Sequence, residues 1–508
     1  MRTNVFTFLL TILGFGLVHA QYTDADAVRF AETITENELK EHLYTYASDE
    51  FEGRDTGSKG QKLAVAYLKD FYVSQNIGAA QTDGSYFQKV PVSMNKTPEG
   101  SIEIDGNTLS LGTDFVSFTP LNASFDDIVF VSYGIDESEY SNYKTVDVSG
   151  KLVFAISGEP VDANGNYLLS GSTEISKWSN RSEGLTKRVE AAKMHGAKGL
   201  LFFDPVNFDR YKSYLNFMRR NNSGRMQLDA EGAPYFSAHI SESVAQNLLA
   251  KVSDQKKSEL LKTSASVAME AGKIAIDTEN VVAYIEGSEK PDEYVIISSH
   301  LDHIGMTRDG EINNGADDDG SGSVAMLEIA QAFKLAAENG SAPKRSIVFL
   351  HVTGEEKGLL GSKYYTDYQP VFPLNQTITN LNIDMIGRID PKREGKRNYI
   401  YLIGSDKLSQ DLHQVSEEVN SKFMNIELDY TFNDENDPNR FYYRSDHYNF
   451  AKNNVPIIFY FNGTHDDYHR VGDTPDKINY DLLENRSRLI FHTAWVAANR
   501  AESIALDQ

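Results

Sequence analysis

The chain has 508 residues, with 73 acidic and 49 basic side chains, a formal net charge of −24 at pH 7, and no cysteine. With 40% hydrophobic and 24% charged residues the composition is that of an ordinary globular protein, which excludes disordered, collagen-like and disulfide-scaffold chains. The negative charge opposes binding to nucleic acid or to an anionic membrane, and the one short basic run, Arg219, Arg220 and Arg225, has no stacking motif beside it. The length predicts roughly two to four domains.

The first 20 residues form the only long apolar stretch. Arg2 gives it a positive start, an apolar core runs from Val5 to Val18, and Val18-His19-Ala20 is a small-residue cleavage site. This pattern predicts a secretory signal peptide over residues 1–20, because the run is short for a membrane span. Without cysteine neither a disulfide nor a lipid-modified thiol can form, so we expect a secreted or periplasmic protein that folds by core packing alone and has no membrane partner after cleavage.

The pattern of the next segment predicts two amphipathic helices, followed by a region of short β-strands. Apolar residues recur at three- and four-residue spacing over residues 27–34 and 63–71, with a turn-rich segment at 52–57 between them. From about Pro91 to Gly272 short β-rich runs dominate, at 128–133, 151–156 and 199–203. We therefore expect residues 21–92 to be the N-terminal part of one domain, residues 93–272 an inserted β-rich domain, and residues 273–508 the main domain.

From Asn280 onward, apolar runs alternate with helical patterns. The runs cover residues 281–285, 294–297, 347–352, 381–386, 399–403 and 455–461. Continuous Val, Ile, Leu and Phe runs of this length are typical of strands in a sheet that helices cover on both faces. The prediction is an α/β fold with a mostly parallel, mixed sheet sandwiched by helices, and in such sheets binding sites form beyond the carboxyl ends of the strands.

Acidic and imidazole side chains follow these predicted strands where each one ends. They are His300 and Asp302, the loop Asn313–Gly322 with its three consecutive aspartates, Glu355 and Glu356, Asp384, and the pair Tyr468-His469. Clusters of this kind at one edge of a sheet would concentrate enough negative charge to require a cation. Carboxylates together with imidazoles suit zinc or a similar first-row metal.

Two of these clusters have simpler explanations. The aspartates at 317–319 could form a calcium loop or a solvated turn, although their spacing does not match the EF-hand pattern. Considered without their neighbours, Glu355 and Glu356 would be interpreted as two charged residues on the protein surface. Directly after a buried strand, however, such a pair must face a polar cavity or a metal.

Together these motifs resemble the zinc aminopeptidase and glutamate carboxypeptidase family of co-catalytic metallopeptidases, peptidase family M28. The resemblance spans Asn280 to about Asp481 and rests on His300-x-Asp302, Gly315–Gly322, Gly354-Glu355-Glu356 with Gly358–Ser362, Asp384-Met385, and Tyr468-His469 followed by Asp473-Thr474. Glu52–Gly57 is similar to the N-terminal segment of the family. Asp147–Lys151 and Gly196–Gly199 are similar to a protease-associated domain, the β-rich insert that many members carry.

The resemblance implies a zinc-peptidase (phosphorylase/hydrolase-like) fold and two zinc ions per chain. One ion would be held by His300 and Asp384 and the other by Glu356 and His469, with Asp318 bridging both.

The resemblance also implies roles for the residues around the metals. Glu355 would be the general base, Asp302 would orient the His300 ring through its second nitrogen, and Tyr468 would donate a hydrogen bond to the oxyanion. Arg444, in the string Arg444-Ser445-Asp446-His447, would contact substrate or form a structural ion pair. Because the implied ligand set is complete without them, the nearby histidines at 303, 351 and 465 are expected to be neighbours rather than ligands.

The implied activity is that of a secreted exopeptidase acting on peptides with a free N-terminus. A carboxypeptidase of the glutamate carboxypeptidase type shares the site, but we expect a long helical dimerisation region after its last ligand, and only 39 residues follow His469. A glutaminyl cyclase and a noncatalytic peptide-binding protein are further alternatives. Intact Glu355 and five intact ligand positions favour the enzyme. The sequence carries no signal for the oligomeric state.

Overall fold

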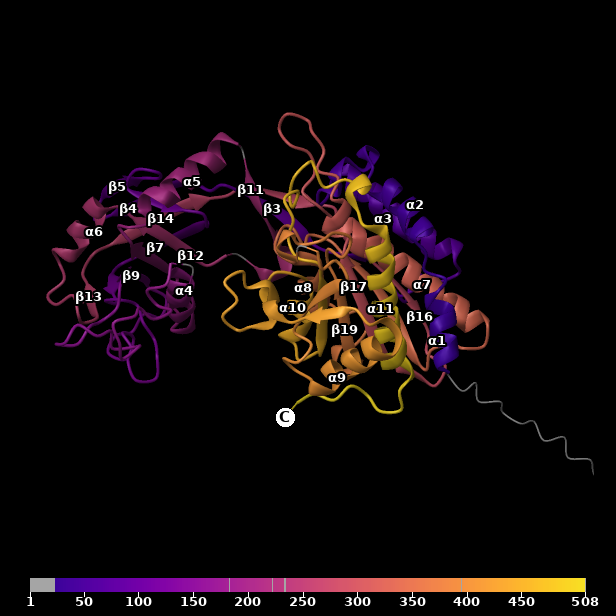
Figure 1. Ribbon diagram of the computed structural model, residues 1–508. Helices are drawn as coiled ribbons and strands as arrows, with labels where there is room; N and C mark the ends of the chain where they lie inside the picture. Colours follow the sequence, from indigo (N-terminus) through magenta and orange to yellow (C-terminus); the bar gives the residue numbers. More distant parts are fainter. Residues whose placement is uncertain (1–22, 182, 222, 233, 394, 508) are drawn as a thin grey trace, which may run out of the picture. The chain divides into compact units, whose positions relative to one another are not determined.

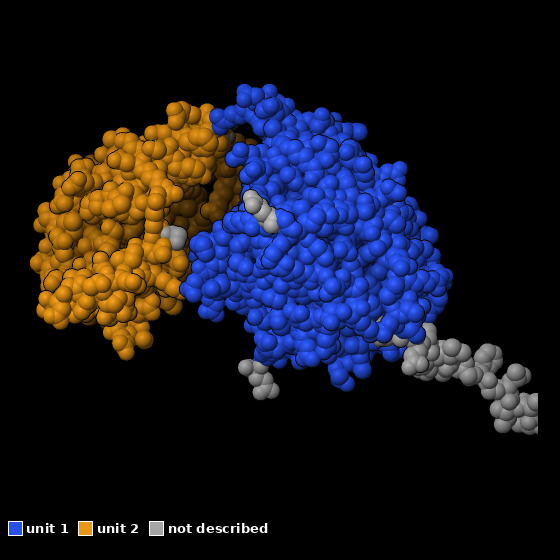
Figure 2. Space-filling view, in the orientation of Figure 1, with its two compact units in different colours: residues 1–90, 278–508 blue, residues 91–277 orange. Residues whose placement is uncertain are grey.

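The computed structural model describes residues 23–181, 183–221, 223–232, 234–393 and 395–507, and the expected signal peptide lies outside them. The chain divides into two compact units (Figures 1 and 2). Unit 1 comprises the residues up to Val90 and from Thr278 onward, and unit 2 comprises Pro91–Asp277. The expected insert, residues 93–272, falls within unit 2, and its identity as a protease-associated domain stays a prediction.

Unit 1 is built on a nine-stranded mixed sheet, which confirms the predicted α/β fold class. Its four middle neighbours, β18, β17, β19 and β22, run parallel to one another, and β16 and β20 flank them antiparallel. The strands are β1 (Gly78–Ala79), β2 (Phe87–Lys89), β16 (Glu279–Ile285), β17 (Lys290–His300), β18 (Arg345–Val352), β19 (Thr377–Ile383), β20 (Tyr399–Ile403), β21 (Glu427–Asp429) and β22 (Ile457–Phe461).

Helices cover both faces of this sheet (Figure 1). Alternate residues of a strand point to opposite faces, so Val281 and Val295 join one core whereas Val282 and Ile296 join the other. The first core is closed by α1 (Asp24–Ala31), α2 (Glu36–Tyr46), α3 (Lys59–Ser74), α7 (Gly322–Glu338), α9 (Gln410–Val419) and α11 (Tyr480–Asn499). The second is closed by α8 (Leu360–Asp367) and α10 (His447–Ala451).

The elements differ from the sequence-based expectation in two places. The helix predicted over residues 27–34 corresponds to α1, which ends at Ala31. A helix that was not predicted, α2, follows it from Glu36, where the Thr35 hydroxyl caps it by accepting a hydrogen bond from the backbone N–H of Glu38 at 3.3 Å. The expected strand at 381–386 ends at Ile383, and Met385 has a left-handed backbone with φ of 62°. A strand cannot continue through that conformation, so Asp384 leaves the sheet at its edge.

The described residues of unit 2 form three further sheets and three α-helices. The six-stranded sheet has the order β13 (Glu259–Leu261), β8 (Ile128–Phe130), β9 (Leu152–Ile156), β10 (Gly199–Phe203), β12 (Phe236–Ile240), β6 (Phe115–Ser117). The four-stranded sheet has the order β5 (Asn107–Ser110), β4 (Glu99–Ile104), β14 (Ala265–Glu270) and β7 (Leu121–Phe125). The three-stranded sheet has the order β11 (Gly224–Leu228), β3 (Val92–Lys96) and β15 (Lys273–Ile276). The helices are α4 (Gly184–Met194), α5 (Phe208–Arg220) and α6 (Glu242–Leu249).

Within the described part of the chain, no helix combines the length and the apolar character that a membrane crossing requires.

Candidate metal centre and active site

The parallel strands of unit 1 bring the predicted site residues to one edge of the sheet. Because β18, β17, β19 and β22 are parallel neighbours, their carboxyl ends meet there. β17 ends at His300 itself, and the loop before α7 supplies Asp318. The remaining residues follow the other strands: Glu355 and Glu356 after β18, Asp384 after β19, and Tyr468 and His469 after β22.

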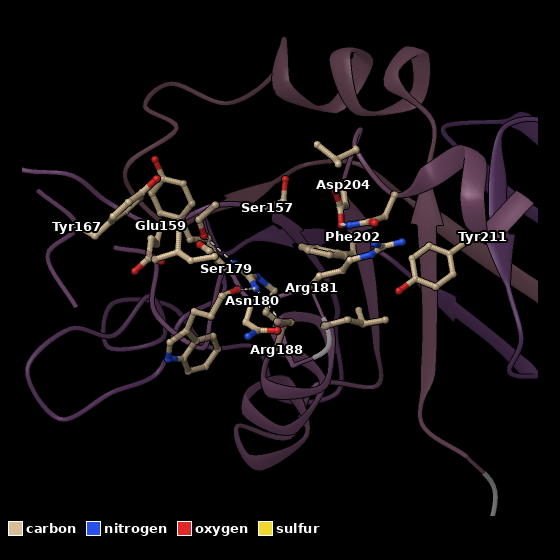
Figure 3. A pocket seen from close by; sticks show the side chains of 18 of the residues that line it. Ser157, Glu159, Tyr167, Ser179, Asn180, Arg181, Arg188, Phe202, Asp204 and Tyr211 are labelled. Atoms are coloured by element: carbon tan, nitrogen blue, oxygen red, sulfur yellow. Dashed lines mark hydrogen bonds between the residues drawn. The ribbon is translucent and has the colours of Figure 1, made fainter. Parts of the chain in front are cut away.

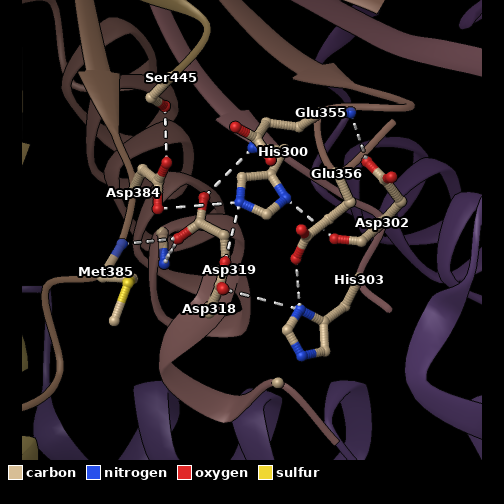
Figure 4. Close-up of polar contacts among 12 residues, drawn as sticks. His300, Asp302, His303, Asp318, Asp319, Glu355, Glu356, Asp384, Met385 and Ser445 are labelled. Carbon is tan, nitrogen blue, oxygen red and sulfur yellow. Dashed lines mark hydrogen bonds and ion pairs between the residues drawn. The ribbon is translucent and has the colours of Figure 1, made fainter. Parts of the chain in front are cut away.

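Asp318 lies between two groups of donor atoms (Figure 4). Its Oδ1 is 3.1 Å from His300 Nε2, which is also 3.8 Å from Asp384 Oδ1. Its Oδ2 is 3.0 Å from His469 Nε2, which is 3.3 Å from Glu356 Oε2. The five residues that the resemblance predicts as ligands therefore come together, and the two oxygens of one carboxylate face the two groups.

The donor atoms fit divalent metal ions. Among the described residues, the buried atoms His300 Nε2, Asp318 Oδ2 and Glu356 Oε1 have no hydrogen-bond partner. Leaving a buried polar atom without a partner costs about 1–3 kcal/mol, and more for a charged group. Imidazole nitrogens and carboxylate oxygens that converge in this way are typical ligands of zinc and similar ions.

The electrostatics of the two groups favour a bound cation. Burial opposes the charge on Asp318, yet the contacts from His300 and His469 hold the pKa of Asp318 well below its usual range. Burial likewise lowers the pKa of His469, but Asp318 and Glu356 outweigh it and raise that pKa to about 10. The carboxylates thus stay charged and retain protons on their histidine neighbours, which a metal ion would displace.

Glu355 lies beside these groups. Its backbone N–H donates to Asp302 Oδ1 at 3.1 Å, and its side chain is partly buried. Burial, helped by the nearby carboxylates of Glu356, Asp384 and Asp446, raises the pKa of Glu355 well above its usual range, while His300 opposes the shift. A carboxylate with a raised pKa is a stronger base than an ordinary one and is suited to accept and return a proton.

Asp302 is placed differently from the expectation. The His300 ring contacts Asp302 through its second nitrogen, but the partner atom is the Asp302 backbone oxygen, 2.9 Å from Nδ1. The Asp302 carboxylate instead accepts from the Thr56 hydroxyl at 2.7 Å and from the Glu355 N–H. The ring is therefore oriented by the main chain, because the carboxylate is already engaged on its other side.

Tyr468 and Arg444 share a small cavity with Glu355. The cavity has a volume of about 30 Å³, and Asp318, Asp384, Met385, Phe441 and His469 are among its lining residues. Arg444 Nη2 donates to Tyr468 Oη at 3.4 Å. Burial and the carboxylates of Asp318, Asp384 and Glu356 raise the pKa of Tyr468, which keeps its hydroxyl protonated as a donor.

Several supporting residues were not expected from the sequence. The Ser445 hydroxyl donates to Asp384 Oδ2 at 2.6 Å. Asp473 accepts from the backbone N–H groups of Asp317 and Asp318 at 3.0 and 3.1 Å. Asp319 Oδ2 accepts from the His300 N–H at 3.2 Å. These contacts join segments far apart in the chain, so spacing alone does not reveal them; the strings around Ser445 and Asp473 were the available signal.

The nearby histidines have different surroundings. His351 is hydrogen-bonded to Tyr72 Oη at 2.7 Å and is close to Ser299, so it is a satisfied core residue. His465 Nε2 lies 3.2 Å from Asp317 Oδ2, outside the two donor groups. His303 lies against Glu356 and is considered further below.

A larger cavity, of about 790 Å³, lies in unit 2 (Figure 3). One of its charged lining residues, the buried Arg188, is already engaged, because its guanidinium donates to the backbone oxygens of Tyr133, Trp178, Gly184 and Gly158. The metal-donor groups found among the described residues lie in unit 1. The smaller cavity, beside these groups, is therefore the candidate functional site.

Fold and site together define an α/β domain with a candidate two-position metal centre at the carboxyl edge of its sheet. Residues 280–494 match the model of "Peptidase family M28".

Similar proteins include both peptidase types of this family. A segment of 128 residues is 35% identical to a probable leucine aminopeptidase 2 of Aspergillus oryzae, and 106 residues are 34% identical to a probable glutamate carboxypeptidase of Arabidopsis thaliana. These matches cover 23% and 21% of this chain and only 23% and 14% of the relatives' own lengths. Among solved structures, an aminopeptidase from Aneurinibacillus sp. strain AM-1 is 16% identical over 95% of this chain and 98% of its own, with a TM-score of 0.48. A zinc aminopeptidase from Bacillus subtilis is 14% identical over 92% and 97%, with a TM-score of 0.47.

Proposed function

We propose that this protein is a secreted di-zinc exopeptidase that removes residues from the free N-termini of peptides. The observation that carries the proposal is the position of Asp318, whose two oxygens face two separate groups of histidine and carboxylate donors. Glu355, which is not among the proposed ligands, stands beside both groups. That combination is what hydrolysis by a co-catalytic centre requires.

The proposed ligands are His300 and Asp384 for one ion, Glu356 and His469 for the other, and Asp318 for both. Bound zinc would supply Lewis acidity and lower the pKa of a water molecule.

The chain's own residues account for the proton transfers. The Glu355 carboxylate accepts a proton from the attacking water and returns it to the leaving amine. Burial raises its pKa, which makes the carboxylate a stronger base toward the water proton. The Tyr468 hydroxyl, kept protonated, donates to the oxygen on which negative charge develops. Arg444 holds that hydroxyl from the other side and lies where a substrate would pass.

The direction of cleavage is tested with one defined peptide, offered with a free and with an acetylated N-terminus to the zinc-loaded protein and followed by mass spectrometry. Stepwise loss from the free N-terminus, with the acetylated copy intact, is the expected result. Loss from the C-terminus of both copies would contradict it and support the carboxypeptidase alternative, which similarity to the Arabidopsis protein favours.

A second comparison separates an enzyme from a peptide-binding protein. Glu355→Gln removes the proposed base without changing the size of the side chain, and we expect turnover to fall by about 10²–10⁴-fold. Glu286→Gln, at an exposed position after β16, is the matched control and should behave as wild type. Undiminished hydrolysis by Glu355→Gln would remove Glu355 from the mechanism. Conversion of N-terminal glutamine to its cyclic form, without hydrolysis, would identify a glutaminyl cyclase instead.

A further inference from the structure

His303 is a buried histidine at the edge of the metal centre. It lies three residues after the end of β17, and its exposed fraction is 0%. Its Nδ1 is 2.9 Å from Glu356 Oε1 and 3.8 Å from Asp318 Oδ2 (Figure 4). These two carboxylates are the ones that also contact His469.

The contact between His303 and Glu356 is close but is not directed as a hydrogen bond. At 2.9 Å the two atoms are near enough to bond, yet neither has a hydrogen-bond partner among the described residues. His300 Nε2, 3.1 Å from Asp318 Oδ1, shows the same combination. Such atoms keep lone pairs free for a third partner, and one ligand atom each of His303, Asp318 and Glu356 lies within 4.8 Å of the others, close enough to hold one ion.

The position of the His303 ring is fixed by its surroundings. Its backbone N–H donates to the Arg54 oxygen at 3.2 Å. The ring packs against Gly315, where an added Cβ would lie only 2.5 Å from His303 Cδ2. On another side it meets the His469 ring edge-on, with 5.8 Å between ring centroids. Glycine at position 315 is therefore needed to leave room for the ring beside the carboxylates.

We propose that His303 is a third histidine ligand of the centre, acting at the position shared by Glu356, His469 and Asp318 Oδ2. The inference rests on the proposed two-metal function. It makes the two positions unequal: His300, Asp384 and Asp318 Oδ1 serve one, whereas four side chains serve the other. An ion with the larger donor set is held more firmly, so zinc fills the His303 position first and leaves it last.

The test is X-ray absorption spectroscopy on the zinc-loaded full chain, which counts the imidazoles bound per zinc, together with the zinc content of the same sample. Wild type is expected to give three imidazoles for every two zinc ions. His303→Gln is expected to give two imidazoles for every two zinc ions and to bind its tighter zinc at least about tenfold more weakly. His465→Gln is the matched control, because His465 is also a buried histidine against an aspartate but outside the donor groups.

The outcomes separate the inference from the function on which it rests. Two zinc ions with only two imidazoles in wild type, or an unchanged imidazole count in His303→Gln, would overturn the role of His303 and leave the two-metal centre intact. Fewer than two zinc ions in wild type would overturn the two-metal centre itself. Circular dichroism checks that each variant is folded, and His303→Asn replaces His303→Gln if the longer side chain is not accommodated.

Discussion

The Asp302 carboxylate accepts a hydrogen bond from the backbone N–H of Glu355, the proposed base, at 3.1 Å. Its other oxygen accepts from the Thr56 hydroxyl at 2.7 Å, so a residue of the N-terminal segment is linked through Asp302 to the loop after β18. This linkage explains how a carboxylate that does not reach the His300 ring can still serve the centre. Its position makes Asp302 a support for the loop that carries Glu355, the proposed base.

Replacing Asp302 separates this role from simple charge. Asp302→Asn keeps an oxygen to accept from the Glu355 N–H, and its NH2 can donate to the Thr56 hydroxyl oxygen in a reversed hydrogen bond, so we expect kcat to change by less than tenfold. Asp302→Ala loses both contacts, and we expect kcat to fall about ten- to a hundredfold with little change in KM. Steady-state kinetics on both variants check this. Equal losses in Asn and Ala would show that the negative charge of Asp302, rather than its contacts, matters.

Removing the metal should destabilise unit 1. Without a cation, the carboxylates of Asp318, Glu356 and Asp384 face one another across a buried site. Saturating zinc, at about a hundred times its dissociation constant, should add about 2.7 kcal/mol to the free energy of unfolding. Thermal unfolding of chelated and zinc-supplemented protein measures the difference. Asp318→Asn, which weakens both donor groups, should lose most of the response, and an equal response in this variant would contradict the bridging role.

Tyr468→Phe should slow turnover without preventing metal binding. The substitution removes the hydroxyl but leaves the ring that stacks on His469 at 3.9 Å between centroids. We expect kcat to fall about 10²-fold, as for loss of one oxyanion donor, with the zinc content unchanged. Tyr443→Phe, at an exposed tyrosine, is the control. A rise in KM alone would place Tyr468 in substrate binding rather than in stabilisation of the oxyanion.

Unit 2 should lose stability in mild acid because of His239. Burial lowers the pKa of His239 to about 4 from the ordinary 6.5. A depressed pKa in the folded state means that the unfolded chain takes up the proton first, so the stability is fully present above pH 6.5 and is lost as the pH falls to 4. The loss amounts to roughly 3 kcal/mol over that window.

His239→Phe tests this assignment, because phenylalanine keeps the stack on Tyr211, 4.0 Å away between ring centroids, but cannot be protonated. Urea unfolding is measured by tryptophan fluorescence at several pH values between 4 and 6.5. The free energy of unfolding should fall less steeply with decreasing pH in the variant than in wild type. A dependence as steep as that of wild type would assign the acid sensitivity to other groups.

The sequence by itself determined the elements whose signals are local. Continuous apolar runs predicted the buried strands. His300 lies at the end of one such strand and Glu355 shortly after the end of another, so the same pattern predicted that the candidate site residues lie at strand ends. The family resemblance of the motif around Asp318 implied a bridging residue there, and the two oxygens of Asp318 face two donor groups. Periodicity and motif spacing carry this information because each depends on residues close together in the chain.

Only the tertiary structure decided the contacts between distant segments. Thr56 and Asp302 are 246 positions apart, and Ser445 and Asp384 are 61 apart, so no spacing rule connects them. The antiparallel direction of β16 and the end of β19 before Met385 depend on pairing and backbone geometry, which apolar runs do not encode. The place of His303 was decided in the same way. Whether a buried histidine faces a hydroxyl or a pair of carboxylates depends on which loops the fold brings together, here those of Gly315 and Glu356.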